Sequence, residues 1–162
     1  MSTNGVSNIS VLASFKNLNT LYIDENRISD ISPLAQLAGL TNLTLDSNRI
    51  SDITPLSHLT GLKNLTLSSN NISNIQALAG LKNLTQLYID ANSISDVSPL
   101  AGLSNMHDLG LTDNKITDIS PLAGIKGLTT GSFLYLRGNP LSATSLNVYI
   151  PQLIVRGVNI YD

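Results

Sequence analysis

Acidic side chains recur along this chain at a spacing that would place their carboxylates side by side. Asp24 and Asp46 are 22 residues apart, and Asp90 follows Asp46 by 44 residues. Carboxylates gathered in this way could bind a metal ion or attract a basic partner. Calcium-binding loops, however, place several acids at alternate positions of one short loop, in patterns such as D-x-D-x-D-G. The chain contains no such pattern, so we expect no metal site.

The chain offers little for catalysis. Its two histidines, His58 and His107, are 49 residues apart and fall at different positions of the repeat described below, so neither has a partner for general acid–base chemistry. There are no cysteines, which excludes thiol catalysis and disulfides. We therefore expect a protein that is not an enzyme and that needs no cofactor.

Six asparagines mark an internal repeat. Each follows a Leu-x-Leu or Leu-x-Ile segment; the first five are 22 residues apart, and the sixth follows after 25. These asparagines are Asn26, Asn48, Asn70, Asn92, Asn114 and Asn139. A fixed period of this length is typical of a solenoid of stacked units, here leucine-rich repeats.

Within one repeat, the residues predict a strand followed by a tight turn. Leu87 and Ile89 alternate with polar neighbours, as in a strand with one buried face. Successive strands would stack in parallel, one from each repeat. The asparagine after each strand would turn inward, where its amide can satisfy backbone groups of the turn.

The return path of each repeat is shaped by proline. Prolines recur at one position of the repeat, at Pro33, Pro55, Pro99 and Pro121. Proline opposes a long helix, so we expect short 3₁₀ or extended segments there. Ala77 interrupts this series, and we interpret it as a structural variation. The predicted fold class is an α/β solenoid with a curved parallel β-sheet on its concave face and a short 3₁₀ or extended convex side.

The two ends of the repeat array differ. We expect a single domain over residues 1–162, with a partial first repeat at 1–17, repeats at 18–141 and a C-terminal cap at 142–162. Ser142 would begin a capping helix, Gly157 would end it, and a last strand would follow. The first strand would be an uncovered edge, which is a hazard for association. We expect either a fragment of a longer protein or self-association through this end.

The turn after each strand carries a recognisable signature. It reads Asp30-Ile31-Ser32-Pro33-Leu34 in one repeat and Asp96-Val97-Ser98-Pro99-Leu100 in another. The repeat, over roughly residues 4–141, resembles the internalin type of bacterial leucine-rich repeat. The resemblance implies a curved recognition domain without enzymatic activity, secreted or displayed on a bacterial cell surface, that binds a partner protein.

The candidate binding residues are those that point outward from the strands. Six of the eleven acids fall in these rows, against one base, Arg137. An acidic concave face would disfavour nucleic acid and favour a partner with a basic surface. Equally, Asp and Ser could simply keep an exposed sheet soluble. The predicted partner-binding residues are Tyr22, Asp24, Asp46, Tyr88, Asp90, Asp108, Asp113, Phe133, Tyr135 and Arg137.

Three of the five tyrosines fall in the central outward row, as Tyr22, Tyr88 and Tyr135. Tyrosine is enriched at binding hot spots, but it is also a favoured strand residue. Tyr135 lies in the irregular repeat, where three extra residues precede the last strand in the segment 128–133. This insertion could form a contact at the rim, or it could adapt the last repeat to the cap.

These observations favour a protein-recognition module that binds its partner through the concave face. Two alternatives stay open: a structural spacer within a larger surface protein, and an intracellular regulatory leucine-rich repeat protein. No apolar run is long enough for membrane insertion. Residues 1–5 lack the features of a signal peptide, so a full-length chain of this sequence would be cytoplasmic.

Overall fold

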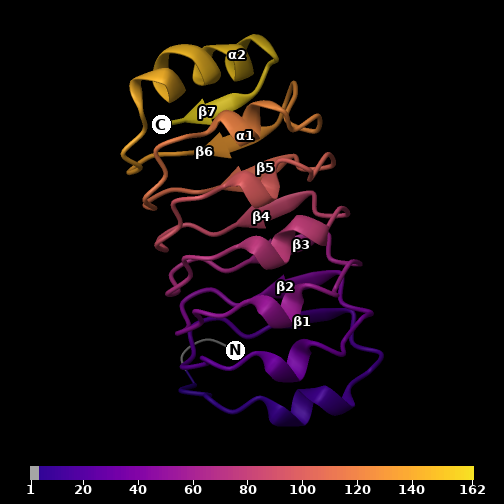
Figure 1. The fold of residues 1–162 in the computed structure, drawn as a ribbon. Helices are drawn as coiled ribbons and strands as arrows, with labels where there is room; N and C mark the ends of the chain where they lie inside the picture. The colour runs from indigo at the N-terminus through magenta and orange to yellow at the C-terminus, as the bar shows by residue number, and fades with distance from the viewer. Residues whose placement is uncertain (1–3) are drawn as a thin grey trace.

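The computed structural model describes residues 4–162 and shows a stack of parallel strands, one from each repeat (Figure 1). Seven strands pair in sequence order in a single sheet, each parallel to the next. The strands are β1 (Thr20–Tyr22), β2 (Asn42–Thr44), β3 (Asn64–Thr66), β4 (Gln86–Tyr88), β5 (Asp108–Gly110), β6 (Phe133–Tyr135) and β7 (Asn159–Tyr161). The register repeats from strand to strand, so that Leu43 pairs with Leu65 and Leu65 with Leu87. The predicted solenoid with a parallel sheet is confirmed.

Short helical turns cover the opposite side of the stack. They are η1 (Ser10–Ser14), η2 (Ser32–Leu34), η3 (Thr54–Leu56), η4 (Gln76–Gly80), η5 (Ser98–Leu100) and α1 (Ser120–Ala123). Proline is at the first or second position of η2, η3, η5 and α1, where its missing N–H costs no hydrogen bond. An Asp or Asn just before each turn holds its start; Asp52 Oδ1, for example, accepts the Thr54 N–H at 2.8 Å. The prediction of short 3₁₀ turns is therefore confirmed.

The core between these two sides is a column of aliphatic side chains. Leu43, Leu65, Leu87 and Leu109 are fully buried, and so are the leucines and isoleucines that follow them in each repeat. Met106 occupies the position held by leucine in neighbouring repeats and is also fully buried. Because every repeat buries its apolar face only against its neighbours, the stack is stable as an array and not as single units.

The inward asparagines tie each turn to the next. Asn70 Oδ1 accepts the Ile50 N–H at 3.0 Å, and its amide nitrogen lies 3.0 Å from both the Leu45 and the Leu67 carbonyl oxygens. Asn48 and Asn114 repeat this pattern one and two turns away. One amide thus satisfies backbone groups from two repeats in a region closed to water.

The residue before each inward asparagine adopts a left-handed backbone. Glu25, Ser47, Ser69, Ala91 and Asp113 all have φ between 49° and 56°, and Gly138 takes the same place in the last repeat at φ 76°. This conformation turns the chain sharply so that the following side chain enters the core. It is unfavourable for a residue with a Cβ by about 1–2 kcal/mol, so the turn stores a small strain in every repeat.

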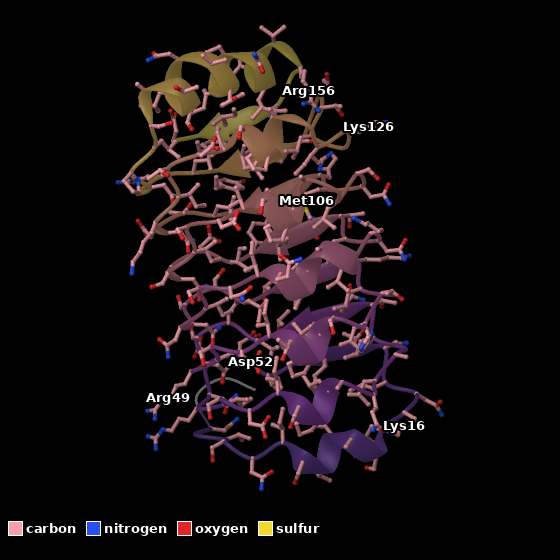
Figure 2. The ribbon with its side chains drawn as sticks, in the orientation of Figure 1. Lys16, Arg49, Asp52, Met106, Lys126 and Arg156 are labelled. Atoms are coloured by element: carbon pink, nitrogen blue, oxygen red, sulfur yellow. The ribbon has the colours of Figure 1, made fainter. Side chains whose placement is uncertain are left out.

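A helix and a strand close the C-terminal end, as Figure 1 shows. The helical segment runs through η6 (Ser145–Tyr149) and α2 (Ile150–Val155), and β7 then adds to the sheet. Ser142 begins it as predicted, with its Oγ accepting the Ser145 N–H at 3.1 Å, and Gly157 ends it at φ 85°. Arg156 fastens this cap to the last turn (Figure 2) because its guanidinium donates to the carbonyls of Ala123 and Ile125.

The other end of the stack is less covered. Ile9 is buried, but Val11 and Phe15 at the first turn are 65% and 51% exposed. Within residues 4–162, η1 is the first turn of the array, and no other turn packs over these two side chains. In the described part of the chain, no helix has the length and apolar character that a bilayer span requires.

The inward amide of Asn70 should be a large contributor to stability. Asn70→Ala leaves the buried Ile50 N–H without its partner, which we expect to lower the free energy of unfolding by about 1–3 kcal/mol. The two carbonyls that lose this amide each keep the amide donor of a neighbouring asparagine. The neighbouring Asn71 is exposed, so Asn71→Ala should change the free energy of unfolding by less than about 0.5 kcal/mol. Urea denaturation of both variants measures the difference. Equal losses would contradict the proposed role of the amide.

Relief of the backbone strain at Ala91 should stabilise the protein. Glycine adopts the left-handed region freely, although it adds entropy to the unfolded chain, so Ala91→Gly should raise the free energy of unfolding by about 0.5–1 kcal/mol. Ala35 has an ordinary helical φ of −56°, so Ala35→Gly should instead destabilise by about 0.5–1 kcal/mol. Thermal melts of the two variants should shift in opposite directions.

Candidate functional site

The outward face of the sheet brings the predicted binding residues into two groups. The register aligns Tyr22 with Thr44 at one end, and Tyr88 with Gly110 and Tyr135 at the other. Aromatic residues gather over strands β4 to β7, while acidic residues follow the ends of the strands. The two groups have different surroundings and support different roles.

The aromatic group contains one residue that the sequence analysis missed. Tyr161 pairs with Tyr135 in the register of β6 and β7, and their rings stack with centroids 4.9 Å apart and planes inclined by 13°. Phe133 lies 6.4 Å from Tyr135 and 6.5 Å from Tyr161, in both cases with nearly parallel planes. We call Tyr88, Phe133, Tyr135 and Tyr161 the aromatic cluster. The predicted strand near residue 160 could have placed Tyr161 here.

Gly110 lets the cluster close over β5. A Cβ on this residue would lie 2.5 Å from Tyr88 Cδ1 and 2.6 Å from Asp90 Oδ2, which is too close for either atom. The missing side chain therefore allows Tyr88 to lean toward Tyr135, and the two ring centroids are 6.4 Å apart although β5 separates their strands. The glycine in the central outward row is thus required for the contact between Tyr88 and Tyr135.

Three of the predicted acids form hydrogen bonds between neighbouring repeats. Asp24 accepts the Thr44 hydroxyl at 2.7 Å and the Asp46 N–H at 2.9 Å. Asp46 does the same one repeat later, with Thr66 at 2.8 Å and the Ser68 N–H at 2.6 Å. We call Asp24, Asp46 and Asp90 the carboxylate ladder. Its members link strand ends, in addition to giving the face its negative charge.

Asp90 completes the ladder with different partners. Its Oδ1 accepts the Thr112 N–H at 2.7 Å, and its Oδ2 accepts the Ser68 hydroxyl at 3.2 Å. Ser68 occupies the ladder position of its own repeat, where its hydroxyl also accepts the Asp90 N–H at 3.2 Å. All donors to the ladder are neutral, so they orient the carboxylates and leave their charge uncompensated.

Asp108 lies on β5 beside the aromatic cluster. Its two oxygens contact His107 Nδ1 at 2.7 Å and the Gln86 amide nitrogen at 2.8 Å. Both His107 and His58 are exposed. His107 contacts Asp108, whose other oxygen accepts the Gln86 amide. Among the contacts of residues 4–162, His107 has no nucleophilic side chain beside it, so these residues form no catalytic dyad.

The remaining predicted residues lie away from the cluster centre. Tyr22 is 58% exposed on the edge strand β1, far along the sheet from the other aromatic rings. Asp113 and Arg137 are exposed just beyond the strand ends. The structure therefore brings Tyr88, Phe133 and Tyr135 together and leaves Tyr22 apart.

The three-residue insertion contacts the C-terminal cap. Ser132 is fully buried, and its carbonyl accepts both the backbone and the side-chain amide of Asn159 at 2.9 and 3.1 Å. The Gly131 N–H donates to the Gly157 carbonyl at 3.3 Å. These contacts favour the interpretation that the insertion adapts the last repeat to the cap, although Thr129 and Thr130 stay exposed at its tip.

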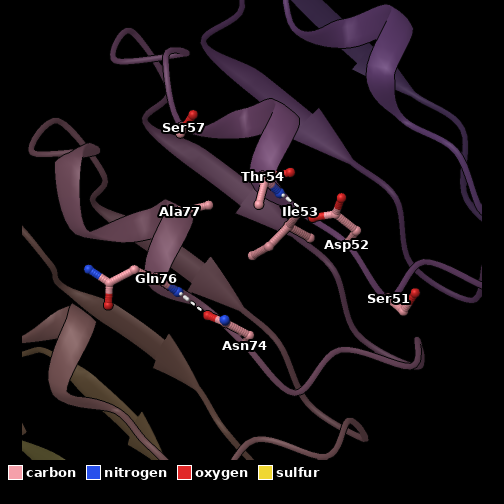
Figure 3. Close-up of a pocket in the computed structure, with 8 residues that line it drawn as sticks. All are labelled: Ser51, Asp52, Ile53, Thr54, Ser57, Asn74, Gln76 and Ala77. Atoms are coloured by element: carbon pink, nitrogen blue, oxygen red, sulfur yellow. Dashed lines mark hydrogen bonds between the residues drawn. The ribbon is translucent and has the colours of Figure 1, made fainter.

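The convex side has a hollow of about 390 Å³ where the proline series is interrupted (Figure 3). Ala77, which stands in place of the proline, lines it together with Thr54 and Gln76. Asp52 and Asn74 at its edge already accept backbone N–H groups at 2.8 and 2.9 Å. The hollow therefore follows from a structural variation and gathers no reactive groups. Across residues 4–162, no three His, Cys, Asp or Glu side chains are grouped as metal ligands.

Burial and charge shift two pKa values on the outward face. Burial raises the pKa of the Asp46 carboxyl above its ordinary value, and the hydrogen bonds from Thr66 and Ser68 oppose this effect only in part. Burial also raises the pKa of the Tyr88 hydroxyl, to which the negative charges of Asp108 and Asp90 add. Both shifts indicate a region where negative charge is disfavoured.

Because the pKa of Asp46 is raised, the stability of the protein should depend on pH through this residue. The folded protein holds this proton more tightly than the unfolded chain, so the Asp46 contribution to stability falls as pH rises through the unfolded value near 3.8. Asp46→Asn lacks this titration. Its stability relative to the wild type should therefore increase between about pH 3 and pH 6. Urea denaturation at several pH values tests this, and a constant difference would contradict it.

Comparison with known proteins identifies the repeat. The family model described as "Leucine rich repeat" matches residues 38–94, and the model "Leucine Rich repeats (2 copies)" matches residues 16–58. No curated protein matches the chain significantly.

Solved structures extend the match over the whole chain. An internalin (inlF) from Listeria monocytogenes is 33% identical with a TM-score of 0.87; the alignment covers 98% of this chain and 47% of that one. Internalin C2 from the same organism is also 33% identical, with a TM-score of 0.76 and coverage of 99% and 76%. A leucine-rich repeat protein of Leptospira interrogans is 25% identical, with a TM-score of 0.85 and coverage of 98% and 40%. The chain belongs to the internalin-type family of bacterial leucine-rich repeat proteins.

Proposed function

We propose that this protein is a recognition module that binds a partner protein through the outward face of its sheet, without catalysis. Leucine-rich repeat proteins are generally protein-interaction modules, and internalin-like proteins are typically not enzymes. The chain spans 47% of the internalin inlF chain. That this chain has the binding activity of a complete internalin is therefore also a proposal.

The observation that carries the proposal is the aromatic cluster. Four rings gather over strands β4 to β7, and Tyr161 remains 52% exposed although it stacks on Tyr135. Aromatic residues are enriched at binding hot spots because they bury a large area with few rotatable bonds. Rings that already contact one another lose little further freedom when a partner covers them.

The surrounding charges define the kind of partner. The carboxylate ladder, Asp108 and Asp113 are acidic, and Arg137 is the only base in the same rows. A partner with a basic surface would be attracted to this face and would bind faster at low salt. The proposed site is therefore centred on the aromatic cluster, and the carboxylate ladder adds negative charge to the same face.

Removal of the rings tests this function. The domain is immobilised, and proteins captured from an extract are quantified by mass spectrometry for wild type, for Tyr88→Ala/Tyr135→Ala and for Tyr22→Ala. Loss of two hot-spot tyrosines should reduce capture of the specific partner by about 30-fold or more. Tyr22→Ala removes the same side chain from the same row but outside the cluster, so it should capture the partner as the wild type does.

Thermal melts of the variants separate loss of binding from loss of folding. If Tyr88→Ala/Tyr135→Ala captures its partner as well as Tyr22→Ala does, the cluster is not the binding surface. If the wild type captures no protein above the background of the matrix without immobilised domain, the structural-spacer interpretation is favoured and the recognition function is rejected.

A further inference from the structure

We propose that the side chains around Gly110 form a subsite for an arginine side chain of the partner protein. The subsite consists of Gly110, the rings of Tyr88 and Tyr135, and the carboxylates of Asp90 and Asp108; we call it the Gly110 subsite. The inference rests on the proposed function and adds to it the chemistry of the group that is recognised.

The rings form two sides of the subsite. Tyr88 and Tyr135 occupy the register positions on either side of Gly110, and their centroids are 6.4 Å apart. Gly110 is itself buried, because Tyr88 Cδ1 and Asp90 Oδ2 lie over the place that its Cβ would take. A cation held against the face of a tyrosine ring is attracted by the electrons of the ring, so the two rings favour a cation above β5.

The two carboxylates add negative charge at the same place. Asp90 Oδ2 lies 2.6 Å from the position of a Gly110 Cβ, and Asp108 precedes Gly110 by two residues, which puts it on the same face of the strand. In the described part of the chain, no lysine or arginine forms an ion pair with either carboxylate. Arg137 follows Tyr135 by two residues, in the row of Asp90.

Hydrogen bonds fix these carboxylates without neutralising them. Asp90 receives bonds from Thr112 and Ser68, and Asp108 from Gln86. His107 Nδ1 also contacts Asp108 at 2.7 Å and adds a charge only when the imidazole is protonated. A carboxylate has about four acceptor positions, so each retains capacity for another donor. A neutral partner covering this region would have to remove water from charges that it could not pair, which is unfavourable. A cationic group avoids this cost.

Arginine fits the arrangement better than lysine does. Its planar guanidinium can stack on a tyrosine ring, and its five N–H donors form a fork that can bind a carboxylate with two parallel hydrogen bonds. A lysine ammonium is a compact, strongly hydrated charge with no flat face to stack. The raised pKa of the Tyr88 hydroxyl agrees with a negative potential at the ring, because burial and the charges of Asp108 and Asp90 cause the shift.

A titration with small probes tests the subsite directly. N-acetyl-arginine amide is added to the ¹⁵N-labelled protein, and amide shifts are followed by NMR. We expect saturable shifts centred on Gly110 and Thr112, with a dissociation constant on the order of millimolar. N-acetyl-citrulline amide has nearly the same shape without the charge and should cause no saturable shift. N-acetyl-lysine amide should bind at least about fivefold more weakly.

Matched variants assign the effect to the named residues. Asp108→Asn should weaken binding of the arginine probe by at least about fivefold, whereas Glu25→Gln, the same loss of charge at the other end of the sheet, should leave it unchanged. Gly110→Ala keeps both rings and both carboxylates but displaces Tyr88, so it should also abolish binding. Thermal melts verify that each variant is folded.

The outcomes separate this inference from the proposed function. Equal binding of the citrulline or lysine probe, or equal effects of Asp108→Asn and Glu25→Gln, would overturn the arginine subsite. Partner capture that still depends on Tyr88 and Tyr135 would then leave the proposed function standing. Capture that does not depend on the rings would reject the proposed function, whatever the probes show.

Discussion

Every repeat of this protein depends on one buried amide. From Asn48 to Asn139, the asparagine of each repeat accepts a backbone N–H of the preceding turn and donates to carbonyls of two repeats, as Asn70 does with Ile50, Leu45 and Leu67. To bring that side chain inside, the preceding residue adopts a left-handed backbone, even where it is Ala91 or Asp113. The buried hydrogen bonds outweigh the local strain because unpaired polar groups in a dry core are more costly. The spacing of these asparagines then sets the spacing of the side chains on the outward face of the sheet.

On the outward face, charged side chains also form hydrogen bonds between neighbouring repeats. Asp24 and Asp46 each accept a hydroxyl and a backbone N–H from the next repeat, so part of the acidic face is also structural. Neutral donors hold the carboxylates in place but leave their charge, which gives the face a negative potential. An acid in such a row can therefore serve the fold and a partner at once, and exposure alone does not separate the two roles.

Positions that depart from the repeat pattern produce the aromatic surface on the C-terminal half of the outward face. Gly110 interrupts the central row and lets Tyr88 and Tyr135 approach each other across β5. The insertion before β6 anchors the cap through Ser132 and Asn159, and the cap strand supplies Tyr161 to the cluster. Arg156 holds the capping helix against the last turn. The end that closes the core is thus also the end that assembles the aromatic surface.

The sequence by itself determined the repeat, the parallel sheet, the short turns and the helix-plus-strand cap, because buried aliphatic residues and inward asparagines recur with a strict period. It also identified most of the outward residues, since alternation along a strand separates its two faces. Only the tertiary structure decided which of them meet. The stacking of Tyr161 on Tyr135, the hydrogen bonds of the carboxylate ladder and the closure of Tyr88 over Gly110 arise between repeats, where distances depend on how neighbouring turns pack. A periodic sequence pattern determines the strand position and the face of each side chain. The contacts between side chains of different repeats depend on how the whole stack packs.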